Sequence, residues 1–130
     1  MANIMIQGTT SSAGKSLLCT GLCKIFKEDG YRVYPFKSQN MSSKYYETKE
    51  GYKMSTAQAL QAKAAGIEPD PNMNPILLQP TSDKGSKVII KGQEKYQMEA
   101  MEYFQFKNSL RDMIKDTYGK IEKENEIIVI

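Results

Sequence analysis

The segment Gly8-Thr9-Thr10-Ser11-Ser12-Ala13-Gly14-Lys15-Ser16 decides the fold class of this 130-residue chain. An apolar stretch typical of a buried strand, residues 3–7, precedes it, and a helical pattern runs from Lys15 to about Glu28. Small residues between a strand and a helix let backbone N–H groups converge on phosphate oxygens, and the helix N-terminus adds partial positive charge. The whole segment is therefore predicted to be a phosphate-binding loop, or P-loop, that contacts a nucleotide.

Two side chains of the P-loop are expected to contact the phosphates and the metal ion directly. Lys15 is expected to reach the β- and γ-phosphates of a nucleoside triphosphate, and the Ser16 hydroxyl to ligate Mg²⁺. The spacing G-x5-G-K-S is one residue longer than the usual G-x4-G-K-[ST], and Thr9 occupies the usual glycine place. A tight turn followed by a chance Gly-Lys-Ser is the alternative. No base-reading motif is visible, so ATP is favoured over GTP only because it is the commoner nucleotide.

Outward from the loop, the pattern predicts an α/β fold. Gly30 ends the first helix and residues 31–36 form a second strand, so a parallel strand–helix–strand unit results. Residues 37–53 form a polar loop. The other expected elements are a helix over 54–65, strands over 75–79 and 87–91, a helix over 98–123 and a strand over 126–130. The class is a P-loop NTPase-like, mostly parallel sheet flanked by helices, over 1–130. Because the last expected strand ends with the chain, we expect a truncated sheet, one domain or a fragment of one.

Apolar side chains recur at helical spacing in two of these segments. In the first helix, Leu18, Leu22, Ile25 and Phe26 are expected on one side. Cys19 and Cys23 lie four apart, and we favour thiols packed against the sheet over a disulfide or a metal site. The stripe in the 98–123 helix is expected to pack in the core, with an interaction surface as the alternative. Its members are Tyr103, Phe106, Leu110, Met113, Ile114, Thr117 and Ile121.

Composition excludes several classes of protein. The 18 basic and 15 acidic residues give a net charge of +3, too small for a nucleic-acid binder but suited to a small polyanion. The absence of His excludes Ser-His and Cys-His catalytic pairs and, with only two Cys, most zinc sites. No apolar run approaches the roughly 20 residues that span a bilayer, and no signal peptide is visible. We therefore expect a cytoplasmic protein with neither nucleic-acid nor membrane partners.

Several motifs, in order along the chain, resemble the amino-terminal part of the cobyric acid synthase family. They are the P-loop, Pro35-Phe36-Lys37-Ser38-Gln39-Asn40-Met41-Ser42, Ala57-Gln58-Ala59-Leu60-Gln61-Ala62, Met73-Asn74-Pro75-Ile76-Leu77-Leu78 and Pro80-Thr81-Ser82-Asp83. Dethiobiotin synthetase is a more distant relative that shares the G-x5-G-K loop and the lysine after the second strand. The resemblance implies a synthetase that uses ATP and Mg²⁺ to activate corrinoid carboxylates, as acyl phosphates, for amidation in cobalamin biosynthesis. Ammonia would come from a glutamine amidotransferase domain or chain, which residues 1–130 do not contain.

The same resemblance assigns roles to single residues. It gives Lys15 and Ser16 the phosphate and magnesium roles, and it places Lys37, as a second catalytic lysine, beside the transferred phosphoryl group. Substrate binding at the same sheet edge is implied for Gln39, Asn40, Gln58 and Asn74. By position alone, residues 37–40 fit a solvated loop equally well, and Asn74 fits a turn residue.

Some positions depart from the family's pattern. Lys53 stands where an acidic residue usually helps to hold Mg²⁺, although Glu47 or Glu50 could substitute. Ser12 replaces a common acidic residue, and Gln79 stands where Lys is frequent. We therefore expect the isolated chain to bind nucleotide without catalysis. The alternatives are an interaction module without catalysis and a partition-type ATPase switch, which usually has a lysine at the position of Thr10.

Overall fold

Two sheets form the framework of the computed structural model, which describes residues 2–10, 14–82 and 84–130. The first sheet is parallel, in the order β1 (Ala2–Ile4), β9 (Ile127–Val129), β2 (Val33–Pro35). The second has the order β3 (Gln39–Met41), β6 (Ile76–Pro80), β7 (Ser86–Ile90), β8 (Gln93–Met98). Its β3–β6 pair is parallel and its other pairs are antiparallel. The short strands β4 (Tyr46–Glu47) and β5 (Lys53–Met54) pair separately.

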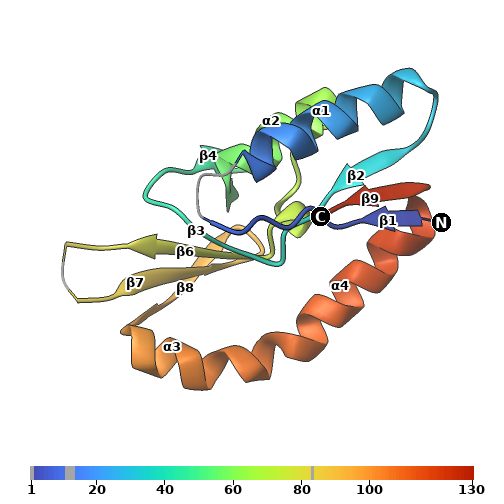
Figure 1. Cartoon of the computed structure of the whole chain (residues 1–130). Coiled ribbons are helices and arrows are strands. Elements are labelled where there is room, and N and C mark those ends of the chain that lie inside the picture. Colours follow the sequence, from blue (N-terminus) through green and yellow to red (C-terminus); the bar gives the residue numbers. More distant parts are fainter. Residues whose placement is uncertain (1, 11–13, 83) are drawn as a thin grey trace.

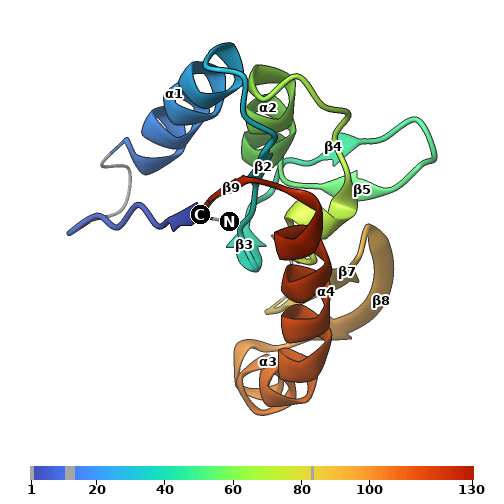
Figure 2. The same ribbon diagram turned by 90° about the vertical axis from the view of Figure 1, so that its right-hand side faces the viewer.

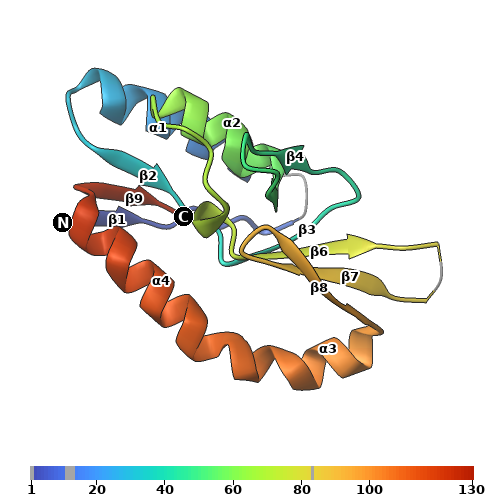
Figure 3. The same cartoon turned by 180° about the vertical axis from the view of Figure 1, so that it is seen from behind.

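Helices cover both faces of the parallel sheet. Helices α1 (Lys15–Glu28) and α2 (Thr56–Ala64) lie side by side on one face (Figures 1 and 2). On the other face, α3 (Ala100–Phe106), a 3-10 turn (Lys107–Leu110) and α4 (Arg111–Glu124) run on from one another beneath both sheets (Figure 3). A second 3-10 turn (Pro71–Met73) precedes β6. The predicted α/β class, a mostly parallel sheet flanked by helices, is confirmed.

Strand β9 lies at the centre of the parallel sheet and is buried on both faces. Ile127 and Val129 pack against Cys19 and Cys23 of α1, whereas Ile128 packs on the α4 face. This alternation follows from the two-residue period of a strand. Both cysteines are free and buried, so the packed-thiol prediction is confirmed. The 103–121 stripe is also buried or partly buried against the sheets, which confirms the prediction of core packing.

Several predicted boundaries were wrong. The expected loop over 37–53 contains three short strands, and β8 was missed because its sequence is polar and its residues are exposed on the outer edge of the sheet. Helix α2 begins at Thr56 because the Ser55 side chain caps it, accepting from the Ala57 N–H. In α1, Leu18 and Ile25 are 52% and 53% exposed, since the buried face centres on the cysteines instead. No helix in the described ranges is long and apolar enough to cross a membrane.

Candidate functional site

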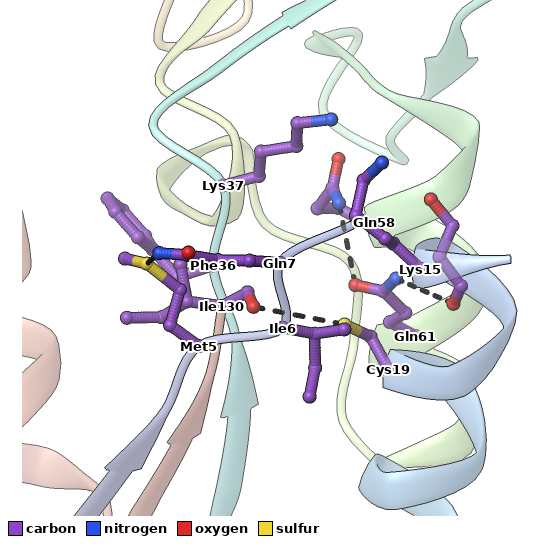
Figure 4. A pocket seen from close by; sticks show the side chains of 11 residues that line it. Met5, Ile6, Gln7, Lys15, Cys19, Phe36, Lys37, Gln58, Gln61 and Ile130 are labelled. Atoms are coloured by element: carbon purple, nitrogen blue, oxygen red, sulfur yellow. Dashed lines mark hydrogen bonds between the residues drawn. The ribbon is translucent and has the colours of Figure 1, made fainter. Parts of the chain in front are cut away.

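A pocket of about 210 Å³ lies where the parallel strands end and α1 begins (Figure 4). Its walls include residues that directly follow β1, β2 and β9, together with side chains from α1 and α2. The polar lining residues are Gln7, Lys15, Ser16, Lys37, Gln58 and Gln61. The carboxyl edge of a parallel sheet is where open α/β folds bind ligands, so the topology alone marks this pocket.

The described part of the P-loop has the geometry of an anion site. Gly14 precedes the first turn of α1 with a φ of 93°, a left-handed conformation that favours glycine, and none of the described side chains caps this helix end. A Cβ on Gly8 would lie 3.0 Å from Lys15 Cδ, so glycine there leaves room for the Lys15 side chain. Lys15 Nζ donates to the Thr10 carbonyl oxygen at 3.0 Å. N–H groups that no described side chain caps and the Lys15 ammonium therefore lie at the same helix end, which suits phosphate. The predicted contacts at Ser11, Ser12 and Ala13 lie outside the described residues.

Lys37 enters the same pocket from the end of β2. Its backbone is held on both sides, because its N–H donates to the Met73 oxygen at 2.8 Å and its carbonyl accepts from Asn74 Nδ2 at 3.1 Å. The side chain extends into the pocket opposite Lys15 (Figure 4). Burial raises the pKa of the Cys19 thiol at the pocket wall, and the positive charge of Lys37 opposes that rise. The structure thus brings the two predicted lysines together from different elements.

Two glutamines of α2 form a hydrogen-bonded relay in which the partners fix the orientation of each side-chain amide. Gln61 Nε2 donates to the Ser16 carbonyl at 3.1 Å, and Gln58 Nε2 donates to Gln61 Oε1 at 3.4 Å. A carbonyl can only accept, so Gln61 must present its nitrogen to Ser16 and its oxygen to Gln58. Gln58 must then direct its own oxygen elsewhere. That oxygen is buried, has no partner among the described residues, and lies on the side of the lysine ammonium groups (Figure 4). Gln58 therefore offers the pocket a hydrogen-bond acceptor.

The two predicted asparagines are engaged by the protein itself. Asn74 is 1% exposed; its Nδ2 donates to the carbonyls of Lys37 and Ile76, and its Oδ1 accepts from the Ser55 N–H. Asn40 Nδ2 donates to Ser55 Oγ at 2.8 Å. Neither lines the pocket. Their amides join the start of α2 to the Lys37 segment, which makes them supports of the site.

Gln39 lies away from the pocket. It follows Lys37 by two residues, but its side chain accepts a hydrogen bond from the Tyr103 hydroxyl on the α3 side of the second sheet. The predicted residues thus fall into three groups: Lys15, Ser16, Lys37 and Gln58 in the pocket, Asn40 and Asn74 behind it, and Gln39 across the sheet. Gln61 was not predicted as a site residue, because its role depends on a Ser16 carbonyl 45 residues away.

The donor set of the pocket fits a nucleotide better than a bare metal ion. Within the described ranges, no acidic residue lines it and no group of three His, Cys, Asp or Glu side chains is placed to hold a metal. Neither Lys53, Glu47 nor Glu50 belongs to the pocket, and Lys53 Nζ instead donates to Glu94 Oε1 at 2.6 Å. Mg²⁺ needs oxygen ligands and commonly takes several from phosphates and water. The Ser16 hydroxyl suits such an ion when it arrives with a triphosphate.

Comparison with known families and known proteins shows what the chain is similar to. The family model for the CobQ/CobB/MinD/ParA nucleotide binding domain matches residues 4–129. The chain is 55% identical over 130 residues to a cobyric acid synthase of Clostridium botulinum and 56% identical over 128 residues to one of Lachnoclostridium phytofermentans. A third, from Ruminiclostridium cellulolyticum, is 57% identical over 127 residues.

These alignments cover 98–100% of this chain but only 25–26% of each relative, so the chain spans about a quarter of their length. The predicted resemblance to cobyric acid synthases is confirmed. No solved structure matches the chain. Because the family model covers nearly every residue, the chain belongs to the CobQ/CobB/MinD/ParA nucleotide binding domain family.

Proposed function

We propose that this chain is the ATP-binding part of a cobyric acid synthase, in which ATP activates corrinoid carboxylates for amidation. The observation that carries the proposal is the convergence of Lys15 and Lys37 on one pocket at the start of α1. Phosphoryl transfer depends mainly on positioned cations, because negative charge spreads over the transferred group. Two lysines from different elements supply such cations on two sides of a triphosphate.

Each site residue has a distinct part in the proposal. The P-loop, residues 8–16, holds the phosphates; Lys15 neutralises the β- and γ-phosphates, and Lys37 faces the γ-phosphoryl group from β2. Mg²⁺ bound with the nucleotide would supply further charge neutralisation, with Ser16 as its protein ligand. Gln58 offers its free carbonyl oxygen to an N–H or O–H donor of a ligand. Asn40 and Asn74 serve the substrate indirectly, by holding the Lys37 segment.

The proposed chemistry has two steps. A corrinoid carboxylate oxygen attacks the γ-phosphorus, the bond from that phosphorus to the β,γ-bridging oxygen breaks, and ADP leaves with the electron pair. Ammonia then attacks the acyl phosphate carbonyl, and inorganic phosphate leaves as the amide forms. Glutamine is the proposed ammonia source, hydrolysed by an amidotransferase domain or chain outside residues 1–130. We therefore expect this chain alone to bind ATP without amidating a corrinoid.

Calorimetric titration with ATP, with and without Mg²⁺, tests the nucleotide part of the proposal. We expect binding by the unmodified chain, strengthened by Mg²⁺, and weaker binding by Lys15→Ala and by Lys37→Ala. Lys24→Ala is the matched control, because Lys24 lies on the exposed side of α1 in an ion pair with Glu28. Equal affinities in all four proteins, or no binding at millimolar ATP, would contradict the proposal.

A further inference from the structure

A second hollow region lies on the α3–α4 side of the second sheet. Two adjacent cavities of about 320 and 190 Å³ share Gln39, Tyr103 and Lys107 and so form one groove. We call it the β3–α4 groove; besides Tyr103, its lining includes Gln39, Met41, Phe104, Lys107, Arg111 and Lys115. Gln39 and Met41 of β3, the edge strand of the second sheet, line the groove. It is separate from the nucleotide pocket and shares no lining residue with it.

One wall of the groove is cationic. Lys107, Arg111 and Lys115 follow one another at a spacing of four, which places them on one face of the helical segment. All three are exposed, and none forms an ion pair with any described residue. The acidic neighbours in sequence, Asp112 and Asp116, make no ion pair with them in these ranges either. Lys107 Nζ lies over the Phe104 ring, 4.3 Å from its centre. This row of three cations, which has no acidic partner among the described residues, is suited to a ligand with several carboxylates.

The other wall is apolar. Met41 and Phe104 are 63% and 62% exposed, and Leu78 and Met98 lie beside them in the same cavity. Large exposed apolar side chains next to polar groups are typical of a binding surface. A ligand that matches both walls has an apolar ring face and an anionic edge.

The groove is connected to the nucleotide pocket through the short segment between β2 and β3. Lys37 points into the pocket, and Gln39, two residues further on, lines the groove. The Tyr103 hydroxyl donates to Gln39 Oε1, so the Gln39 amide nitrogen stays available to donate to a ligand carboxylate. A carboxylate held by Gln39 would lie two residues along the chain from the lysine that enters the pocket, on the other side of the sheet.

We propose that the β3–α4 groove binds the corrinoid, with the ring against Met41 and Phe104 and peripheral carboxylates along Lys107, Arg111 and Lys115. The inference rests on the proposed function, because that function supplies the corrinoid as substrate. It adds where the substrate lies: across the sheet edge from ATP, with Gln39 and Lys37 between the two ligands.

Titration of the chain with a corrinoid polycarboxylate, followed by its visible absorption, tests the groove. The triple variant Lys107→Gln/Arg111→Gln/Lys115→Gln is expected to bind the corrinoid about tenfold or more weakly, with ATP affinity unchanged. A control triple, Lys24→Gln/Lys49→Gln/Lys95→Gln, changes the net charge equally on exposed positions outside the groove. It is expected to keep corrinoid affinity within about twofold. A second variant, Met41→Gln/Phe104→Gln, is expected to weaken corrinoid binding at constant charge.

The outcomes separate the two proposals. Equal losses of corrinoid affinity in both triple variants would show that the net charge of the chain, and not the groove, determines the affinity. Unchanged corrinoid affinity in the groove triple would overturn the assignment of the corrinoid to the groove. ATP binding without any corrinoid binding by the unmodified chain would also overturn the groove while leaving the nucleotide site. Loss of ATP binding by the unmodified chain would instead overturn the proposed function.

Discussion

Replacing Asn74 with alanine is expected to destabilise the chain strongly, because this buried amide supports the segment that presents Lys37. The change removes hydrogen bonds to Ser55 N–H, the Lys37 carbonyl and the Ile76 carbonyl. At about 1 kcal/mol net for each bond, the loss is about 3 kcal/mol, with a further cost if the partners stay dry. Natural domains are stable by about 5–15 kcal/mol, so this single change removes a large share of the total.

Urea unfolding measures the effect. With an m-value of about 2 kcal/mol/M, a loss of about 3 kcal/mol lowers the midpoint by about 1.5 M. Asn74→Asp has nearly the same size but loses both donated bonds and sets a carboxylate against two carbonyls, so it should destabilise at least as much. Asn72→Ala is the control, because the Asn72 side chain forms no hydrogen bond with the described residues, and its midpoint should stay close to that of the unmodified chain. If Asn74→Ala kept its urea midpoint and lost only ligand binding, Asn74 would be a substrate-contact residue and the reasoning from its buried bonds would be refuted.

Three further predictions concern the pocket and the core. Lys15→Ala should weaken ATP affinity at least tenfold, about 1.4 kcal/mol, in a calorimetric titration; unchanged affinity would remove the P-loop assignment. Gln61→Met keeps the side-chain volume but removes the hydrogen bonds to the Ser16 carbonyl and to Gln58, so the Gln58 amide loses its orientation. ATP affinity should fall severalfold; an unaltered affinity would show that these hydrogen bonds do not contribute to nucleotide binding. Burial raises the pKa of the Cys23 thiol from 9.0 to about 12. The contribution of this shift to the stability of the folded state is fully present below pH 9 and is lost as the pH rises toward 12. Cys23→Ala should therefore lose less unfolding free energy over that interval than the unmodified chain; identical pH profiles would contradict the shift.

Much of the fold could be predicted from local sequence. The first helix was predicted over the range that α1 occupies, because glycines with positive φ flank it and its pattern is helical throughout. The strands predicted over 75–79 and 87–91 correspond to β6 and β7, whose antiparallel pairing the structure adds. The missed strands β3 and β8 are short or polar, and they are strands only because neighbouring strands pair with them. Pairing across a sheet joins segments far apart in sequence, so the local periodicity of either segment does not predict it.

The candidate site, like the fold, was predictable from local sequence only in part. The sequence predicts that Lys15 and Ser16 contact phosphate, because a phosphate site needs small residues, Lys and Ser at set spacing between a strand and a helix, and both residues line the pocket. Gln58 and Asn74 were assigned to substrate together, yet the structure places one in the pocket and the other behind it. Both side chains end in an amide, but the amides differ in partners: Gln58 has an oxygen with no partner among the described residues, whereas Asn74 uses both ends within the protein.

By itself, the sequence determined that this chain is an α/β protein with a phosphate-binding loop, because strand period, helix period and loop composition are local properties. Only the tertiary structure decided that Lys37 faces Lys15, that Gln61 orients Gln58, and that Gln39 lines a different groove. Each of these depends on contacts between residues far apart along the chain, such as the 64 residues that separate Gln39 from Tyr103. The direction of a polar side chain follows from which donors and acceptors the folded chain leaves around it, and those partners come together only when the sheets and helices pack.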